Sequence, residues 1–465
     1  MARLGAIKGP LATAAAALCL AASLYPPGVA HGEAQARVIA ERLTLNFFPC
    51  AERVWPGVPW ETLAFVFHEP HSGGATLIAR KRGDDRWAIE PLAAERLGAI
   101  HPSALKASFA LIELDGRRTL LTRIDARANE DEAQRATEVA LHEAFHKIGQ
   151  RHFRSADNVF RGPQLPANVE VRAMRRMLAE RLLFEDAGAI PKAAYWHKRY
   201  VSSDPSRGQT TSALDRIEGS AEFVGILGTA LAELGCTAPT HKIHERALQY
   251  VSAKWTARYD RLFDSFPDVE SYVIGAAASL RLDMKNAPRW RDEVASGRTP
   301  AELLLEQIEP ANDVEDAATV ARLRKSYDSL NRRYAQRLSD LASRAAASPA
   351  PRIGIGSGGH SGAYQPTQGF FLVQVGERVK QAALGVNGSF SFDDGALSAE
   401  LLRADVLLNE STPCSAQPRW VLLPDKDVAV AAFFEGTVLA RTFQLKSSRG
   451  WRVVGSPPDL WICIP

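Results

Sequence analysis

The residues best suited to chemistry lie in the stretch L-H-E-A-F-H-K-I-G-Q-R-H, residues 141–152. His142 and His146 are four positions apart, so on a helix both imidazoles project from the same face, about one turn apart. This spacing lets two nitrogens bind one zinc ion, and Glu143 is then placed to take a proton from an attacking water. The pattern H-E-x-x-H therefore predicts a zinc site with a general base.

Such a site needs a third protein ligand, and His152 is the first candidate. Read through to His152, the stretch resembles the extended motif of the metzincins, in which a glycine lets the chain turn so that a third histidine reaches the metal. Metzincins also have a methionine-containing turn beneath the zinc. Met174 and Met177 instead lie in a stretch with helical period and no turn residues. This departure favours another third ligand.

Glu218 is the second candidate, within R-I-E-G-S-A-E-F-V-G. The box E-G-S-A-E-F resembles the E-G-x-A-E-(Tyr/Phe) helix of bacterial gluzincins, the thermolysin-like metallopeptidases. The resemblance implies that Glu218 is the third zinc ligand, on a helix that packs against the H-E-x-x-H helix. Glu222, one turn further on, would orient a ligand histidine. The small residues Gly219, Ser220 and Ala221 suit a close approach of the two helices.

The resemblance covers about residues 105–285 and departs from thermolysin in its spacing. His146 and Glu218 are further apart than in thermolysin-like enzymes. Helix-forming stretches at 169–183 and 189–200 lie between them, which indicates an inserted helical hairpin.

Further roles follow only from the same resemblance. Gluzincins have an edge strand above the metal that pairs with an extended peptide, so one strand of 108–125 is a candidate substrate-binding edge. They also supply a Tyr or His to the developing oxyanion, and Tyr272 resembles the tyrosine in that position. Tyr195 and His197 in the inserted segment remain alternatives to Tyr272.

The surrounding pattern predicts the elements that position these residues. Residues 62–67 are typical of a buried strand, and 108–125 of a hairpin that turns at Asp115-Gly116. Acidic residues at 130–132 begin a helix that Gly149 is suited to end. Hydrophobic periodicity predicts further helices at 169–183, 189–200, 216–234, 272–282 and 323–338.

The C-terminal part has a different pattern. Residues 346–362 are rich in Ala, Pro, Gly and Ser and indicate a linker. Beyond it, strand-like runs occur at 370–375, 420–423, 428–434 and 437–445. We therefore expect an α+β protein: a mainly helical, zincin-like metallopeptidase domain with a small N-terminal β-sheet, followed by a separate all-β C-terminal domain. The expected divisions are 1–30, 31–128, 129–345, 346–362 and 363–465.

The first of these divisions, 1–30, is typical of an export signal. Arg3 and Lys8 precede an apolar run at 11–24, and small residues follow, with cleavage expected near Ala30. The apolar run is too short to cross a bilayer, so we expect no membrane span in the mature chain and a periplasmic or secreted location. The formal net charge is +3, and without these two basic residues it is near zero, which implies no nucleic-acid partner.

Four cysteines remain after the signal, namely Cys50, Cys236, Cys414 and Cys463. An even, sparse set in an exported chain favours two disulfides over a thiol-bound metal. Proximity in sequence favours the pairs Cys50–Cys236 and Cys414–Cys463 among the three possible pairings.

Two classes of function compete. The first is an exported zinc metallopeptidase acting on protein or peptide, with zinc held by His142, His146 and Glu218 and with Glu143 as base; its metzincin variant uses His152. The second is a non-catalytic exported binding protein. A structural zinc site has no use for a base, so Glu143 favours the enzyme. In either case the C-terminal domain is a candidate for binding an unidentified protein or an envelope partner.

Overall fold

The computed structural model describes residues 30–464 except 71–75, 84–85, 101, 125–129, 155–167, 184–187, 204–207, 256–268, 348–351, 356–359, 367–369, 393–396, 409–419, 424–436, 440–441, 449–451 and 456–460. Most of the expected export signal and the expected strand at 428–434 thus lie outside the described residues. Among the helices that are described, none is both long and apolar enough to cross a membrane.

The N-terminal part contains a small mixed sheet with strand order β3-β2-β1-β5-β4. Its strands are β1 (Ala64–His68), β2 (Thr76–Lys81), β3 (Trp87–Pro91), β4 (Phe109–Leu114) and β5 (Arg117–Arg123). β1 and β5 are parallel, and the other neighbours are antiparallel. β4 is an edge strand. It turns into β5 through Asp115 and Gly116, whose φ angles are 54° and 70°, so the predicted hairpin is confirmed.

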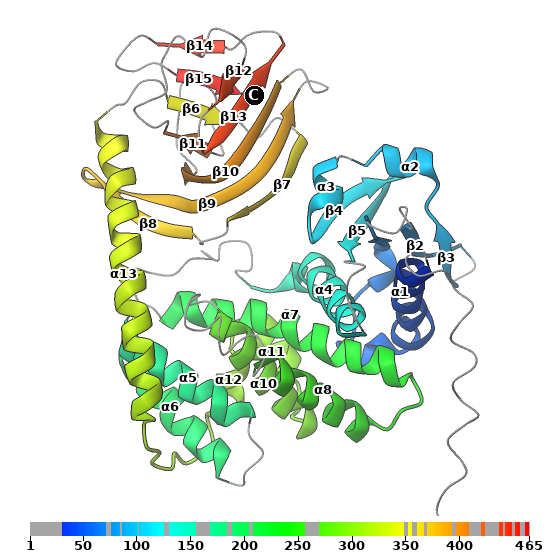
Figure 1. The fold of residues 1–465 in the computed structure, drawn as a ribbon. Coiled ribbons are helices and arrows are strands. Elements are labelled where there is room, and N and C mark those ends of the chain that lie inside the picture. Colours follow the sequence, from blue (N-terminus) through cyan, green and yellow to red (C-terminus); the bar gives the residue numbers. More distant parts are fainter. Residues whose placement is uncertain are drawn as a thin grey trace, which may run out of the picture.

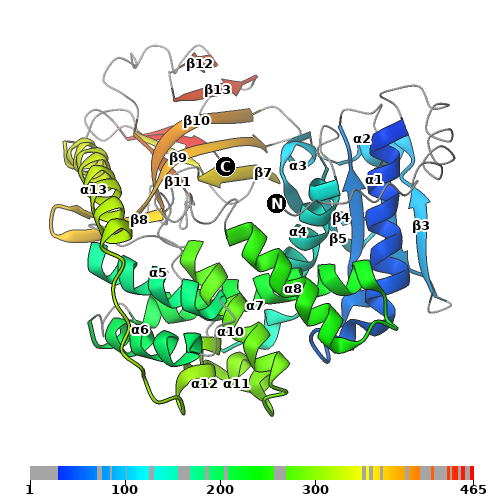
Figure 2. The ribbon, with the colours of Figure 1, turned by 60° about the horizontal axis from the view of Figure 1, so that its bottom comes forward.

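Helices cover both faces of this sheet. One face lies against α1 (Ala30–Glu41) and the helix that carries the two histidines, α4 (Glu130–Ile148) (Figure 2). Side chains such as Phe65 and Leu120 belong to the buried core on this face. The opposite face packs on α2 (Ala94–Gly98) and α3 (Pro102–Lys106). The short helices η1 (Arg42–Phe47), η2 (Phe48–Arg53) and η3 (Trp60–Thr62) connect α1 to β1.

The middle of the chain is helical, as predicted. After α4 come η4 (Gln150–His152), α5 (Val169–Leu183), α6 (Ala189–Ser203), α7 (Gly208–Leu234), α8 (Thr240–Lys254), α10 (Val269–Met284), α11 (Trp290–Ser296), α12 (Pro300–Leu305) and α13 (Ala317–Ala346). Each helix predicted from periodicity lies within one of these. Helices α8, α11 and α12 were not predicted from the sequence, nor were α1, α2 and α3 of the N-terminal part.

The C-terminal part is a β-sheet that packs against α13. Its strands are β6 (Arg352–Ile355), β7 (His360–Pro366), β8 (Phe370–Val375), β9 (Arg378–Phe392), β10 (Leu397–Leu408), β11 (Trp420–Leu422), β12 (Thr437–Leu439), β13 (Phe443–Ser447), β14 (Arg452–Val454) and β15 (Trp461–Ile464). β9 and β10 are long antiparallel partners at its centre. The structure is thus mixed, with a small N-terminal sheet, a helical middle and a C-terminal sheet.

This sheet is less separate than the sequence suggested. Figure 1 shows α13 running from beside α5 to the C-terminal sheet. Tyr334 of α13 packs on Phe371 with ring centroids 4.9 Å apart, and Arg337 pairs with Asp405. The expected linker at 346–362 differs from the structure, because it contains β6 and the start of β7. Pro and Gly suggested a linker there, but β6 pairs with β11 and β15 in the sheet.

A disulfide joins the N-terminal segment to the end of α7. Cys50 and Cys236 form a disulfide with Cα atoms 5.7 Å apart, which is one of the two pairs predicted from the sequence. Arg53 donates to the carbonyl oxygens of Cys236 and Ala238 at 2.6 and 2.9 Å. Cys463 is also disulfide-bonded, and Cys414 lies outside the described residues.

Candidate metal centre

Helix α4 presents two histidines because its opposite side is anchored in the core. Leu141, Phe145 and Ile148 are almost completely buried. His142 and His146 therefore project together from the other side, with ring centroids 4.7 Å apart. The two imidazoles thus lie on one side of the helix, as their spacing in the sequence predicted.

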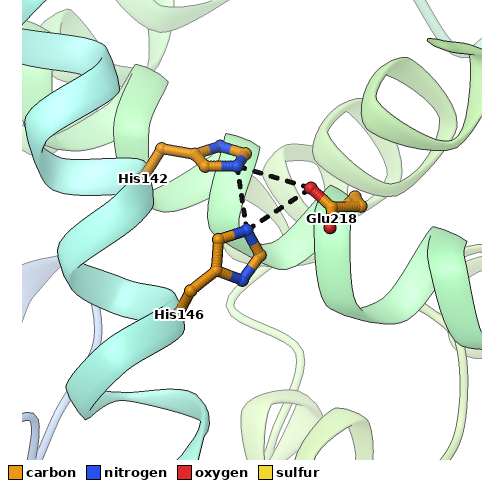
Figure 3. A group of neighbouring side chains, drawn as sticks. All are labelled: His142, His146 and Glu218. Carbon is orange, nitrogen blue, oxygen red and sulfur yellow. Dashed lines mark hydrogen bonds and ion pairs between the residues drawn. The ribbon is translucent and has the colours of Figure 1, made fainter. Parts of the chain in front are cut away.

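Glu218 of α7 meets both histidines. Its Oε2 lies 3.5 Å from His142 Nε2 and 3.3 Å from His146 Nε2, and the two Nε2 atoms lie 3.0 Å apart (Figure 3). Ligand atoms about 2.0–2.1 Å from a tetrahedral ion lie about 3.3 Å from one another. The three atoms thus already have the separations that one small tetrahedral cation needs. This buried group could hold a metal ion.

This buried group also favours a bound positive charge, either a proton or a metal ion. Glu218 is 1% exposed and His142 is 7% exposed. Burial lowers the pKa of His142, but hydrogen bonds with Glu218 and Glu222 and the nearby charge of Glu143 raise it to about 10. A proton therefore stays on His142 when no other cation is present. A metal ion would take the place of that proton, since a ligand histidine must be neutral.

Glu222 orients His142, as the sequence suggested. Its Oε2 lies 3.2 Å from His142 Nδ1, so the opposite ring nitrogen faces Glu218. Lys254, at the end of α8, pairs with Glu222 and also with Glu138 of α4. Burial disfavours the charged form of Glu222, but Lys254 and His142 hold its pKa well below its usual range. Glu222 is therefore an anionic acceptor for the imidazole.

Gln150 orients His146, which the sequence analysis did not predict. Its Oε1 lies 2.7 Å from His146 Nδ1, and its Nε2 donates to the carbonyl oxygen of Ile217 at 2.6 Å and to Ser220 Oγ at 2.9 Å. Gln150 thus lies two positions before His152, within the stretch that suggested His152 as a ligand. Gln150 touches both ligand-bearing helices.

Glu143 and Tyr272 lie beside the group without belonging to it. Glu143 is half-buried next to His142. Tyr272, on α10, stacks on the His142 ring with centroids 5.7 Å apart and an interplanar angle of 8°. Tyr195 and His197, the alternatives to Tyr272, lie on α6, outside the group of three.

His152 is not part of the group. It lies exposed at the end of η4, and the metal-binding group found among the described residues is formed by His142, His146 and Glu218. Met174 and Met177 are buried on helix α5, so neither forms a turn beneath the histidines. Between the two candidates for the third residue, the geometry favours Glu218.

Gly219, one of the small residues of the glutamate box, faces another helix than expected. A Cβ on Gly219 would lie 2.4 Å from Gly275 Cα, so Gly219 permits contact with α10 rather than with α4. The close approach to α4 occurs at Gly225, where a Cβ would lie 3.0 Å from Glu138 O and 3.4 Å from His142 Cβ. The physical reason is helical phase: Gly219 follows Glu218 directly and points about 100° away, whereas Gly225 lies two turns on, on the same side.

A buried ion network links α7 to α5 and α10. Asp215, one turn before Glu218, accepts from Arg175 of α5 at 2.5 and 3.0 Å. Arg175 also pairs with Glu270 of α10, which pairs with Arg172. Glu270 precedes Tyr272 by two residues, so the network ties down the segments that carry Glu218 and Tyr272.

Three functional neighbours were missed from the sequence: Gln150, Lys254 and Gly225. Gly225 follows from the seven-residue spacing to Glu218, which puts both on one side of a helix. Lys254 had no such signal, since it reaches the site from a helix that was not predicted.

Comparisons with protein-family models, curated proteins and solved structures give no match for this chain.

Proposed function

We propose that the protein is a zinc-dependent metallopeptidase that hydrolyses peptide bonds in proteins or peptides. The observation that carries this proposal is the meeting of His142 Nε2, His146 Nε2 and Glu218 Oε2 at separations of 3.0 to 3.5 Å. Two imidazole nitrogens and one carboxylate oxygen suit zinc, whereas calcium and magnesium prefer oxygen ligands throughout. The chemistry of the donor atoms therefore fits zinc.

His142, His146 and Glu218 would hold the zinc ion. Bound zinc would supply Lewis acidity, which polarises a carbonyl and lowers the pKa of water to about 7. Glu143 would take the proton from the attacking water and pass it to the leaving amine nitrogen. Tyr272 is our candidate for donating a hydrogen bond to the oxygen that becomes negative in the transition state.

The edge strand β4 is the candidate platform for substrate. It pairs with β5 on one side and is the last strand of its sheet. An extended peptide could add to such an edge through main-chain hydrogen bonds, as in other cases of β-strand addition. The gluzincin resemblance led from the sequence to the hairpin at 108–125, without choosing between its two strands, and β4 is the strand of that hairpin at the edge.

The alternatives have less support. A metzincin-type site would need His152, which is exposed. A structural zinc site favours four protein ligands, whereas the group has three and a neighbouring carboxylate, Glu143. A non-catalytic exported binding protein would make no use of that carboxylate.

We also propose that the protein is exported. The basic and apolar start of the chain has the pattern of a signal peptide. The Cys50–Cys236 disulfide supports this proposal, because such bonds persist in oxidising compartments. Residues 363–465 would then be available to an envelope or protein partner outside the cytoplasm.

The variant Glu143→Gln tests the proposed chemistry. The substituted amide would keep the size of the side chain but could not accept the proton, so hydrolysis of a mixed, unstructured protein substrate such as casein should fall by about 10²–10⁴-fold. Zinc content should remain that of the wild type, since Glu143 is not a ligand. A wild-type protein that binds zinc but hydrolyses no protein or peptide would favour the binding protein.

A further inference from the structure

Gln150 is a buried amide between the two helices that carry the metal-binding group. It is 4% exposed and lies in η4, directly after α4. It contacts His146 Nδ1 on one side, and Ile217 O and Ser220 Oγ on the other. Ile217 immediately precedes Glu218, so one side chain touches one metal-binding residue and the turn that carries another.

The contacts fix the orientation of the amide. The carbonyl oxygen of Ile217 can only accept a hydrogen bond, so the group 2.6 Å from it must be the NH₂ of Gln150. The amide oxygen then faces His146. Ser220 agrees with this orientation, because its hydroxyl accepts from the same NH₂ at 2.9 Å and donates to Ile217 O at 3.4 Å.

The orientation of the amide in turn fixes the tautomer of His146. An amide oxygen can only accept, so Nδ1 of His146 must carry the hydrogen across the 2.7 Å contact. In the neutral ring Nε2 then has the free lone pair. Nε2 is the atom that lies 3.3 Å from Glu218 Oε2, where a metal ion would be bound.

We propose that Gln150 is a positioning residue that selects the metal-binding tautomer of His146 and aligns this histidine with the α7 turn bearing Glu218. This rests on the proposed metal site. The ring of His142 is oriented by a charged partner, Glu222. The ring of His146 is instead oriented by a neutral amide, whose own orientation is set by a backbone carbonyl. The two ligand histidines are therefore oriented by different chemistry.

The test uses the full-length mature protein, zinc ion alone as the probe, and competition with a chromophoric chelator. Gln150→Met keeps the bulk of the side chain but has no amide. Loss of a group that orients a ligand histidine typically costs about 10–100-fold in metal affinity, and we expect a loss in that range for Gln150→Met. Ser220→Ala is the matched variant, since it removes one partner of the NH₂ without touching His146. Its zinc affinity should stay within about threefold of wild type.

The outcomes separate this inference from the proposed function. Wild-type affinity in Gln150→Met, or an equal loss in Ser220→Ala, would overturn the inference while leaving the zinc site intact. A wild-type protein without zinc affinity would overturn the proposed function itself. Thermal unfolding of both variants without metal checks that they are folded.

A second measurement needs no variant at Gln150. Nitrogen-15 NMR of the metal-free wild type reports which nitrogen of each neutral imidazole carries hydrogen, and His146→Gln assigns the signal by its absence. We expect hydrogen on Nδ1 of His146. Hydrogen on Nε2 instead would overturn the inference even if Gln150→Met did not fold.

Discussion

Helix α7 has two faces with different structural roles. The face toward α4 carries Glu218 and Glu222, both buried, and meets the two histidines through polar contacts. The face toward α10 has its backbone in contact at Gly219 and Gly275, with Asp215 in an ion network nearby. The first face holds the groups that could bind a metal, and the second sets where the helix lies.

Because the two faces differ, substitutions on one face should affect a different property of the protein from substitutions on the other. Changes toward α10 alter the position of the whole helix, so they should appear as lost stability. Changes toward α4 alter the orientation of a ligand, so they should appear as lost metal affinity in a folded protein. Measuring both quantities for each variant therefore tests the division.

The largest effect should come from breaking the buried ion network. Arg175→Met leaves Asp215 and Glu270 buried without their shared partner, and breaking a buried pair in this way costs about 3–5 kcal/mol. Denaturant unfolding of the metal-free protein measures this loss. A stability within about 1 kcal/mol of wild type would mean that the network does not hold α7.

A somewhat smaller loss is expected at the glycine contact. The added methyl of Gly219→Ala would lie 2.4 Å from the backbone of Gly275, which cannot move alone, so the helices must separate. Overpacking of this kind costs about 1–3 kcal/mol. Gly98→Ala is the matched control, because a Cβ there meets nothing within 4 Å. Equal unfolding free energies for the two variants would contradict the close contact.

Glu222→Gln should affect metal binding more than folding. The amide can still accept from His142 Nδ1 but is no longer anionic and no longer pairs with Lys254 as an ion. We expect zinc affinity to fall about 10–100-fold, which equals about 1.4–2.7 kcal/mol. Chelator competition measures it. Unchanged affinity together with reduced stability would place this face in the same class as the α10 face.

The sequence predicted the metal-binding group better than the residue that orients one of its histidines. His142 and His146 followed from a local motif, because four-residue helical spacing brings side chains together without knowledge of the fold, whereas Glu218 followed only from a resemblance. Gln150 followed from neither, since its role depends on a carbonyl at Ile217, far away in the chain. Local spacing predicts what one helix presents, and only the packed structure reveals what meets it.

The same distinction holds for the fold. The hairpin at Asp115-Gly116 and the helix at 169–183 follow from turn residues and periodicity, which are local. The packing of the C-terminal sheet on α13 is non-local, and the Pro- and Gly-containing stretch at 346–362 concealed strand β6. The expectation that Gly219 faces α4 was wrong, because a residue directly after Glu218 points about 100° away from it and so toward α10.

The most direct test of the central claim is the zinc content per chain of three purified mature proteins: wild type, Glu218→Gln and His152→Gln. We predict about one zinc per chain in wild type and in His152→Gln, and a collapse in Glu218→Gln, because Glu218 completes the group of three found among the described residues. Zinc retained in Glu218→Gln but lost in His152→Gln would contradict this prediction and favour the metzincin arrangement. No zinc in wild type, even after zinc is added back, would contradict both arrangements.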